Sequence, residues 1–84
     1  MWIMTQLKNT IVNSDNIHTI FIDRQKGLIK ARLDNSPEGI IALGSYDKDK
    51  IDLVFNYIMG ALTYGLECYR MPLGGEVEKN ERGV

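Results

Sequence analysis

Few side chains in this 84-residue sequence are of the types that carry out covalent or acid–base chemistry. His18 is the one histidine and Cys68 the one cysteine, so a nucleophile paired with a base would have to consist of these two. They fall on predicted strands far apart in the chain, and a single cysteine near a strand is more often a small buried hydrophobe. We therefore expect no catalytic residues and predict that the protein is not an enzyme.

Patterns that bind metals or cofactors are also missing from the sequence. It contains no C-x-x-C pair and no second histidine, and Gly74-Gly75 precedes a polar tail instead of joining a strand to a helix. Asp47, Asp49 and Asp52 fit the acidic start of a helix. We expect no metal site and no cofactor.

The most informative charge feature is a basic hairpin. The stretch 24–32 contains four basic residues and no acidic one, and strand periodicity places Lys30 and Arg32 on one face. Guanidinium and ammonium groups bind phosphates, so we predict a phosphate-binding set. Its members are Arg24, Lys26, Lys30, Arg32 and Arg70. The alternative is a solvated outer face whose lysines discourage edge-to-edge association.

All four tyrosines lie in the C-terminal half of the chain. Tyr46, Tyr64 and Tyr69 are candidates for stacking on a base. A second apolar stripe, offset from the core stripe of the predicted helix, consists of Leu53, Tyr57, Ala61 and Tyr64. Either this stripe contacts another subunit of a homo-oligomer, or the sheet curls around the helix and buries both stripes within one chain.

Composition and periodicity indicate the elements that must position these residues. Hydrophobic residues at 44%, charged residues at 25% and a net charge of −1 are typical of one small globular domain and argue against a general nucleic-acid binder. No apolar run approaches the roughly 18–20 residues of a membrane span, and a single cysteine fits the cytoplasm. A period of two predicts strands up to Gly44, and a period of 3.6 then predicts a helix from an Asp47 cap to a Gly65 stop.

The fold class predicted from these patterns is α+β, a five- or six-stranded antiparallel β-meander with one C-terminal amphipathic helix packed on the sheet. The domain is expected to span 1–73, and 74–84 to form a polar, mobile tail. The predicted core consists of Trp2, Ile20, Ile22, Ile29, Leu33, Ile41, Leu43, Val54, Phe55 and Ile58.

Three motifs in this order resemble those of a family of short uncharacterised β-rich proteins of Gram-positive bacteria and their phages or prophages. They are the opening Trp2-Ile3-Met4-Thr5-Gln6 through Asp15-Asn16-Ile17, the turn Leu43-Gly44-Ser45-Tyr46, and the end Tyr69-Arg70-Met71-Pro72. The resemblance covers most of 1–73 and implies an antiparallel sheet with one helix. It implies no activity that can be assigned to particular residues.

With no catalytic groups and a basic hairpin, we expect a non-enzymatic binding protein. The resemblance implies a phage-encoded protein that acts on the host, in the host cytoplasm. The small size, the basic hairpin and the tyrosines favour sequestration of a phosphorylated small molecule such as a nucleotide signal of host defence. The first alternative is a protein–protein interaction module that inhibits a host protein. The second is nucleic-acid binding through the hairpin, which we rank last because the chain is slightly acidic.

Overall fold

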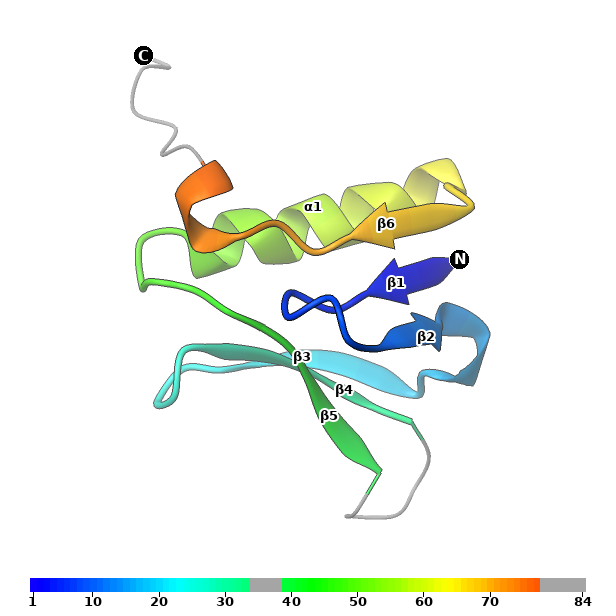
Figure 1. Cartoon of the computed structure of the whole chain (residues 1–84), viewed down its shortest axis with the longest axis horizontal. Helices are drawn as coiled ribbons and strands as arrows, with labels where there is room; N and C mark the ends of the chain where they lie inside the picture. The colour runs from blue at the N-terminus through cyan, green and yellow to red at the C-terminus, as the bar shows by residue number, and fades with distance from the viewer. Residues whose placement is uncertain (34–38, 78–84) are drawn as a thin grey trace.

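The computed structural model describes residues 1–33 and 39–77. In this part of the chain six short strands, one α-helix and two 3₁₀ turns follow one another (Figure 1). In order they are β1 (Trp2–Met4), β2 (Ile11–Asn13), η1 (Ser14–Asn16), β3 (Thr19–Asp23), β4 (Leu28–Arg32), β5 (Ile40–Ser45), α1 (Ile51–Tyr64), β6 (Cys68–Arg70) and η2 (Gly74–Glu76).

The strands form two three-stranded sheets. Sheet A has the order β2-β1-β6, in which β1 and β2 are antiparallel and β1 and β6 are parallel. Sheet B has the order β3-β4-β5 and is antiparallel throughout. The α+β class and the single helix are confirmed, but the single meander is limited to sheet B. The chain returns to β1 only after the helix, and a pairing so distant in sequence leaves no trace in strand alternation.

The hairpin between β3 and β4 forms where the sequence predicts it. Gly27 adopts φ +67°, a left-handed conformation that side chains with a Cβ rarely tolerate. Its carbonyl oxygen accepts a 2.9 Å hydrogen bond from the Tyr46 amide, which ties the turn to the end of β5. The position of the turn is therefore fixed relative to the end of β5.

Helix α1 begins one turn later than predicted and ends where predicted. Lys50 occupies the N-cap position without a side-chain capping bond, while the Asp47 carbonyl accepts bonds from the amides of Lys50 and Ile51. Gly65 ends the helix at φ +69°, and its amide bonds to the carbonyls of Ala61 and Leu62. The glycine at this end is a left-handed C-cap.

The core lies between the inner face of sheet B and a second layer that contains α1 and sheet A. Figure 1 shows α1 and the strands of sheet A on the same side of sheet B. The largest fully buried side chains of the core are Ile3, Ile29, Leu43, Val54, Ile58 and Met71.

The predicted core placement of Trp2 is wrong, because its side chain is 51% exposed. On β1 the alternating pattern turns Ile3 inward and Trp2 outward. Five other predicted core residues are only half-buried at the margin: Ile20, Ile22, Leu33, Ile41 and Phe55.

The motif Leu43-Gly44-Ser45-Tyr46 has a packing explanation. The Tyr46 ring folds back over Gly44, so that a Cβ at Gly44 would lie 2.7 Å from ring atom Cε2 and from the hydroxyl oxygen. Tyr46 is only 5% exposed, and its hydroxyl donates a 2.7 Å hydrogen bond to the Pro72 carbonyl. The glycine makes room for a tyrosine that fastens β5 to the segment after β6.

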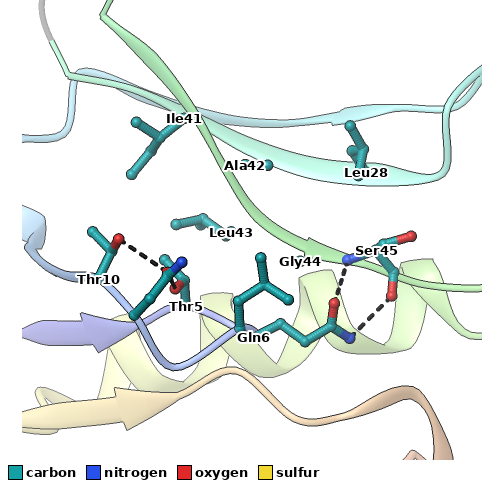
Figure 2. A pocket seen from close by; sticks show the side chains of 11 residues that line it. Thr5, Gln6, Thr10, Leu28, Ile41, Ala42, Leu43, Gly44 and Ser45 are labelled. Atoms are coloured by element: carbon teal, nitrogen blue, oxygen red, sulfur yellow. Dashed lines mark hydrogen bonds between the residues drawn. The ribbon is translucent and has the colours of Figure 1, made fainter.

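Gln6 joins the two sheets (Figure 2). Its backbone amide donates to the Leu43 carbonyl at 2.8 Å. Its side-chain amide accepts from the Ser45 N–H at 2.8 Å, donates to the Ser45 carbonyl at 3.0 Å and reaches the Pro72 carbonyl at 3.3 Å. The carboxamide thus pairs with β5 as the peptide group of a neighbouring strand would.

The fold continues past the expected boundary at residue 73. Val77 is 4% exposed and belongs to the core cluster, and the Lys50 ammonium donates to the Gly74 carbonyl at 3.0 Å. Residues 74–77 of the expected tail are therefore part of the domain. Residues 78–84, and most of the turn expected between β4 and β5, lie outside the described residues.

Candidate functional site

The β3–β4 turn presents two of the predicted phosphate-binding residues. Arg24 and Lys26 follow β3 directly, and both are exposed. The Asp23 carboxylate accepts a 3.3 Å hydrogen bond from the Lys26 backbone amide, which fixes the start of the turn. The two basic side chains are thus carried on a defined turn closed by Gly27.

A hollow of about 350 Å³ lies between this turn and the start of α1. Arg24, Lys26 and Lys48 line it, together with Gln25, Gly27 and Ile51. Lys48 was absent from the predicted set, because it alternates with Asp47 and Asp49 in the sequence and gave no net basic signal. Three cationic residues therefore meet in one concavity.

The hollow also adjoins the first residue of α1. The N-terminal end of a helix carries a partial positive charge from its aligned peptide dipoles. Lys50, at the N-cap position, makes no side-chain capping bond, and the Ile51 amide bonds to the Asp47 carbonyl at 3.0 Å. The N-terminal end of α1 and the three cationic side chains therefore both make the electrostatic potential in the hollow more positive.

Arg24 is already engaged by a carboxylate at this place. Its guanidinium forms two bonds to Asp52, at 2.8 Å and 3.3 Å. The hydrogen bond from Arg24 holds the pKa of Asp52 below its usual range, and the same bond raises the pKa of Arg24. Both side chains are more than 60% exposed, so water screens the pair and an incoming anion can compete for Arg24.

The remaining predicted cations lie elsewhere. Lys30 projects from the outer face of sheet B and bonds to Asp23 at 3.0 Å, which lowers the pKa of that carboxyl. Arg32 is the last residue of β4, at the end away from the β3–β4 turn, and Arg70 lies on β6 in sheet A. Strand periodicity placed Lys30 and Arg32 on one face correctly, but that face is not the one that meets the hollow.

The predicted stacking residues do not line the hollow. Tyr46 is buried in the core by its contact with Gly44. Tyr64 is 84% exposed at the opposite end of α1, about 20 Å away along a helix of this length. Tyr69 is half-buried on β6, and burial raises the pKa of its hydroxyl.

The predicted interface stripe on α1 is divided by the packing. Ala61 is 4% exposed and Leu53 is half-buried against the core of its own chain. Tyr57 and Tyr64 remain 43% and 84% exposed. The chain's own core therefore buries part of this stripe, and Tyr57 and Tyr64 are its exposed part.

His18 and Cys68 are both exposed, on segments belonging to different sheets. The His18 Nδ1 lies 3.2 Å from the Thr19 hydroxyl. Within residues 1–33 and 39–77, no three His, Cys, Asp or Glu side chains gather closely enough to hold a metal ion.

A second hollow of about 200 Å³ lies between the β1–β2 loop and β5. Figure 2 shows Leu28, Ile41 and Leu43 around it, with the Gln6 carboxamide bonded to Ser45 at one end. Thr5, the one buried polar side chain among the described residues, bonds to the Asn9 side chain at 3.3 Å. These polar groups satisfy one another, so this hollow offers less to a charged ligand than the basic one does.

The part of the chain described here contains no helix long and apolar enough to cross a bilayer. Comparison of the chain with known protein families, with curated proteins and with solved structures finds no match.

Proposed function

We propose that the protein is a non-enzymatic binding protein that holds a phosphorylated small molecule in the hollow between the β3–β4 turn and the start of α1. One observation carries this proposal: Arg24, Lys26 and Lys48, from two separate segments, line the same concavity. A phosphate placed there meets charged donors and the positive end of a helix.

The chemistry assigned to each residue follows from its geometry. Arg24 exchanges the Asp52 carboxylate for a phosphate, to which a guanidinium can bind in the same two-pronged manner. Lys26 and Lys48 supply further positive charge from the other walls. The volume of about 350 Å³ is near the lower end of the range of roughly 300–1,000 Å³ for small-molecule sites.

The cationic lining of the hollow favours a phosphorylated ligand, and the resemblance to short proteins of Gram-positive bacteria and their phages suggests where the protein acts. In this proposal the protein is phage-encoded and acts in the host cytoplasm, where it sequesters a nucleotide signal of host defence. Sequestration needs tight binding but no turnover.

Calorimetric titration with a panel of mononucleotides, dinucleotides and cyclic nucleotides tests the proposal. Changing Arg24, Lys26 or Lys48 to alanine is expected to weaken binding of the active nucleotide at least tenfold, because a hydrogen bond to a charged group contributes about 1.5–3 kcal/mol. Lys8→Asn is the matched control, since it removes one positive charge from the β1–β2 loop and asparagine tolerates the φ of +63° found there. If no nucleotide binds, or if the control weakens binding equally, the proposal is wrong.

A gain of affinity provides the complementary test. Asp52→Asn removes the carboxylate that competes for Arg24, while its exposed position leaves the fold intact. The nucleotide that binds the wild type is expected to bind this variant more tightly. Weaker binding by Asp52→Asn would contradict the role given to Arg24.

A second candidate function is inhibition of a host protein through the exposed side of α1. The exposure of Tyr57 and Tyr64 favours it, because tyrosine is enriched at protein interfaces. Tyr57→Ala with Tyr64→Ala is expected to abolish capture of such a partner and to leave nucleotide binding unchanged. Nucleic-acid binding through the basic hairpin predicts instead an affinity that falls steeply with salt.

A further inference from the structure

Strand β3 forms an open edge of sheet B. It pairs with β4 along its whole length, from Thr19 opposite Arg32 to Asp23 opposite Leu28. No other strand of the described chain pairs with its second side. A row of backbone donors and acceptors is therefore presented to the outside.

The register shows which residues face this edge. The Leu33 amide bonds to the Gly39 carbonyl, next to the pairing of Arg32 with Ile40, so Leu33 points toward β5. Backbone groups alternate sides along a strand, so those of Arg32 and Lys30 point toward β3. Thr19 and Phe21, which lie opposite these two, use their backbone groups within sheet B, whereas Ile20 and Ile22 direct theirs outward.

An apolar groove of about 300 Å³ runs beside the edge, between β3 and α1. Met59 and Leu62 of the helix are 54% and 46% exposed there, and Ile17, Ile20 and Phe55 are half-buried. From Thr19 to Ile22 the strand carries no lysine, proline or other residue that usually protects an edge. Edge and groove together offer hydrogen bonds and apolar area to one extended strand.

We propose that β3 of a second copy of this chain occupies this edge. The two strands run antiparallel about a two-fold axis at Phe21, with Ile20 opposite Ile22 of the partner subunit. Each such pair exchanges two backbone hydrogen bonds, and the axis repeats them, which gives four. Sheet B of one copy and sheet B of the other then become one continuous six-stranded sheet.

Self-complementarity favours a second copy over an unrelated peptide. A two-fold axis places each surface against itself, and an uncharged, apolar edge meets no like charge in doing so. Asp23 falls opposite Thr19 of the partner subunit, and its charge is already balanced by Lys30 at 3.0 Å. The same axis brings the exposed Met59 and Leu62 of both copies to the junction between sheet B of one copy and sheet B of the other, where association covers them.

Cysteine cross-linking tests the register. Phe21 sits at the axis in a non-hydrogen-bonded pair, where Cα atoms are about 4.5 Å apart, within the roughly 4.4–6.8 Å that a disulfide spans. In a Cys68→Ser background, Phe21→Cys is expected to form a linked dimer on mild oxidation. Thr19→Cys is the matched control on the same face of the same strand, and it is expected to stay unlinked because its counterpart lies four positions away.

Charge reversal tests the association itself by sedimentation velocity over a concentration series. Wild type is expected to be a dimer, and Phe21→Lys and Phe21→Glu are each expected to be monomers that form a mixed dimer when combined. That recovery shows that each variant is folded, and Tyr57→Glu, on the other side of α1, is expected to leave the dimer intact. A wild-type monomer at all concentrations, a dimer that persists in both Phe21 variants, or equal cross-linking at positions 19 and 21 would overturn the proposal.

Discussion

Arg24 is the residue on which the candidate site depends most. The sequence could indicate it and Lys26 as basic residues on a hairpin, because turn and strand signals are local. It could not indicate Lys48, whose neighbours Asp47 and Asp49 mask its charge in a linear reading. Nor could it show that Asp52, 28 positions along the chain, holds the Arg24 side chain at the hollow.

Tyr46 provides a test at the scale of one side chain. Burial raises the pKa of its hydroxyl well above the usual value, so the unfolded chain loses this proton first as the pH rises. The stability contributed by the protonated form is therefore complete below about pH 10 and declines above it. Tyr46→Phe is expected to cost about 1 kcal/mol at neutral pH, through the lost bond to Pro72, and to weaken the alkaline decline.

Urea unfolding of both proteins from pH 7 to pH 11 measures this effect. Tyr69→Phe is the comparison at neutral pH, where it is expected to cost less than Tyr46→Phe because it loses no bond to Pro72. Since the pKa of Tyr69 is also raised, Tyr69→Phe is expected to weaken the alkaline decline as well. An unchanged alkaline decline in Tyr46→Phe would show that Tyr46 is not the group responsible.

Helix α1 is the element that the sequence predicted best. Its period of 3.6 and its glycine stop are local properties, and both are confirmed. The strands and the meander of sheet B were recognised for the same reason, but the pairing of β1 with β6 was not. Three-residue strands such as β1 and β6 carry too little pattern to specify a parallel pair 66 positions apart.

Two glycines of the helix are expected to respond in opposite ways to alanine. A Cβ at Gly60 meets no atom within 4 Å, so Gly60→Ala is expected to stabilise the protein by about 0.5–1 kcal/mol. Gly65 has φ +69°, so Gly65→Ala is expected to destabilise it by about 1 kcal/mol. Urea midpoints measure both changes, and a Gly60→Ala that destabilises would show that this face is in contact with something outside the chain.

At the scale of the molecule, two small sheets and one helix share a core that no single element could form. Gln6 is the polar link between the sheets, and nothing in its sequence neighbourhood distinguishes it from a surface glutamine. Val77 similarly closes the core from a segment that was predicted to be a tail, because a lone valine among glycines and glutamates gives no periodic signal.

The Gln6 link predicts a pair of unequal substitutions. Gln6→Ala loses the bonds to Ser45 and Pro72 and is expected to cost about 1–3 kcal/mol. Gln6→Glu keeps the size but places a carboxylate against both carbonyls, so it is expected to cost at least as much at pH 7. Repulsion from the carbonyls raises the pKa of this carboxyl in the folded protein above the unfolded value of about 4.3, so the cost is expected to shrink as the pH falls toward about 4 and to be gone below it. Equal stability of Gln6→Glu and wild type at pH 7 would contradict this link.

Native mass spectrometry of the full chain, freshly purified without refolding, tests whether the hollow beside the β3–β4 turn holds a nucleotide. We expect a species that carries the additional mass of a nucleotide, either retained from the cell or acquired from the nucleotide panel. The combined variant Arg24→Ala, Lys26→Ala and Lys48→Ala is expected to carry none. A wild-type protein that remains bare with every member of the panel, or a triple variant that retains the same mass, would contradict the assignment of the hollow as a phosphate-binding site.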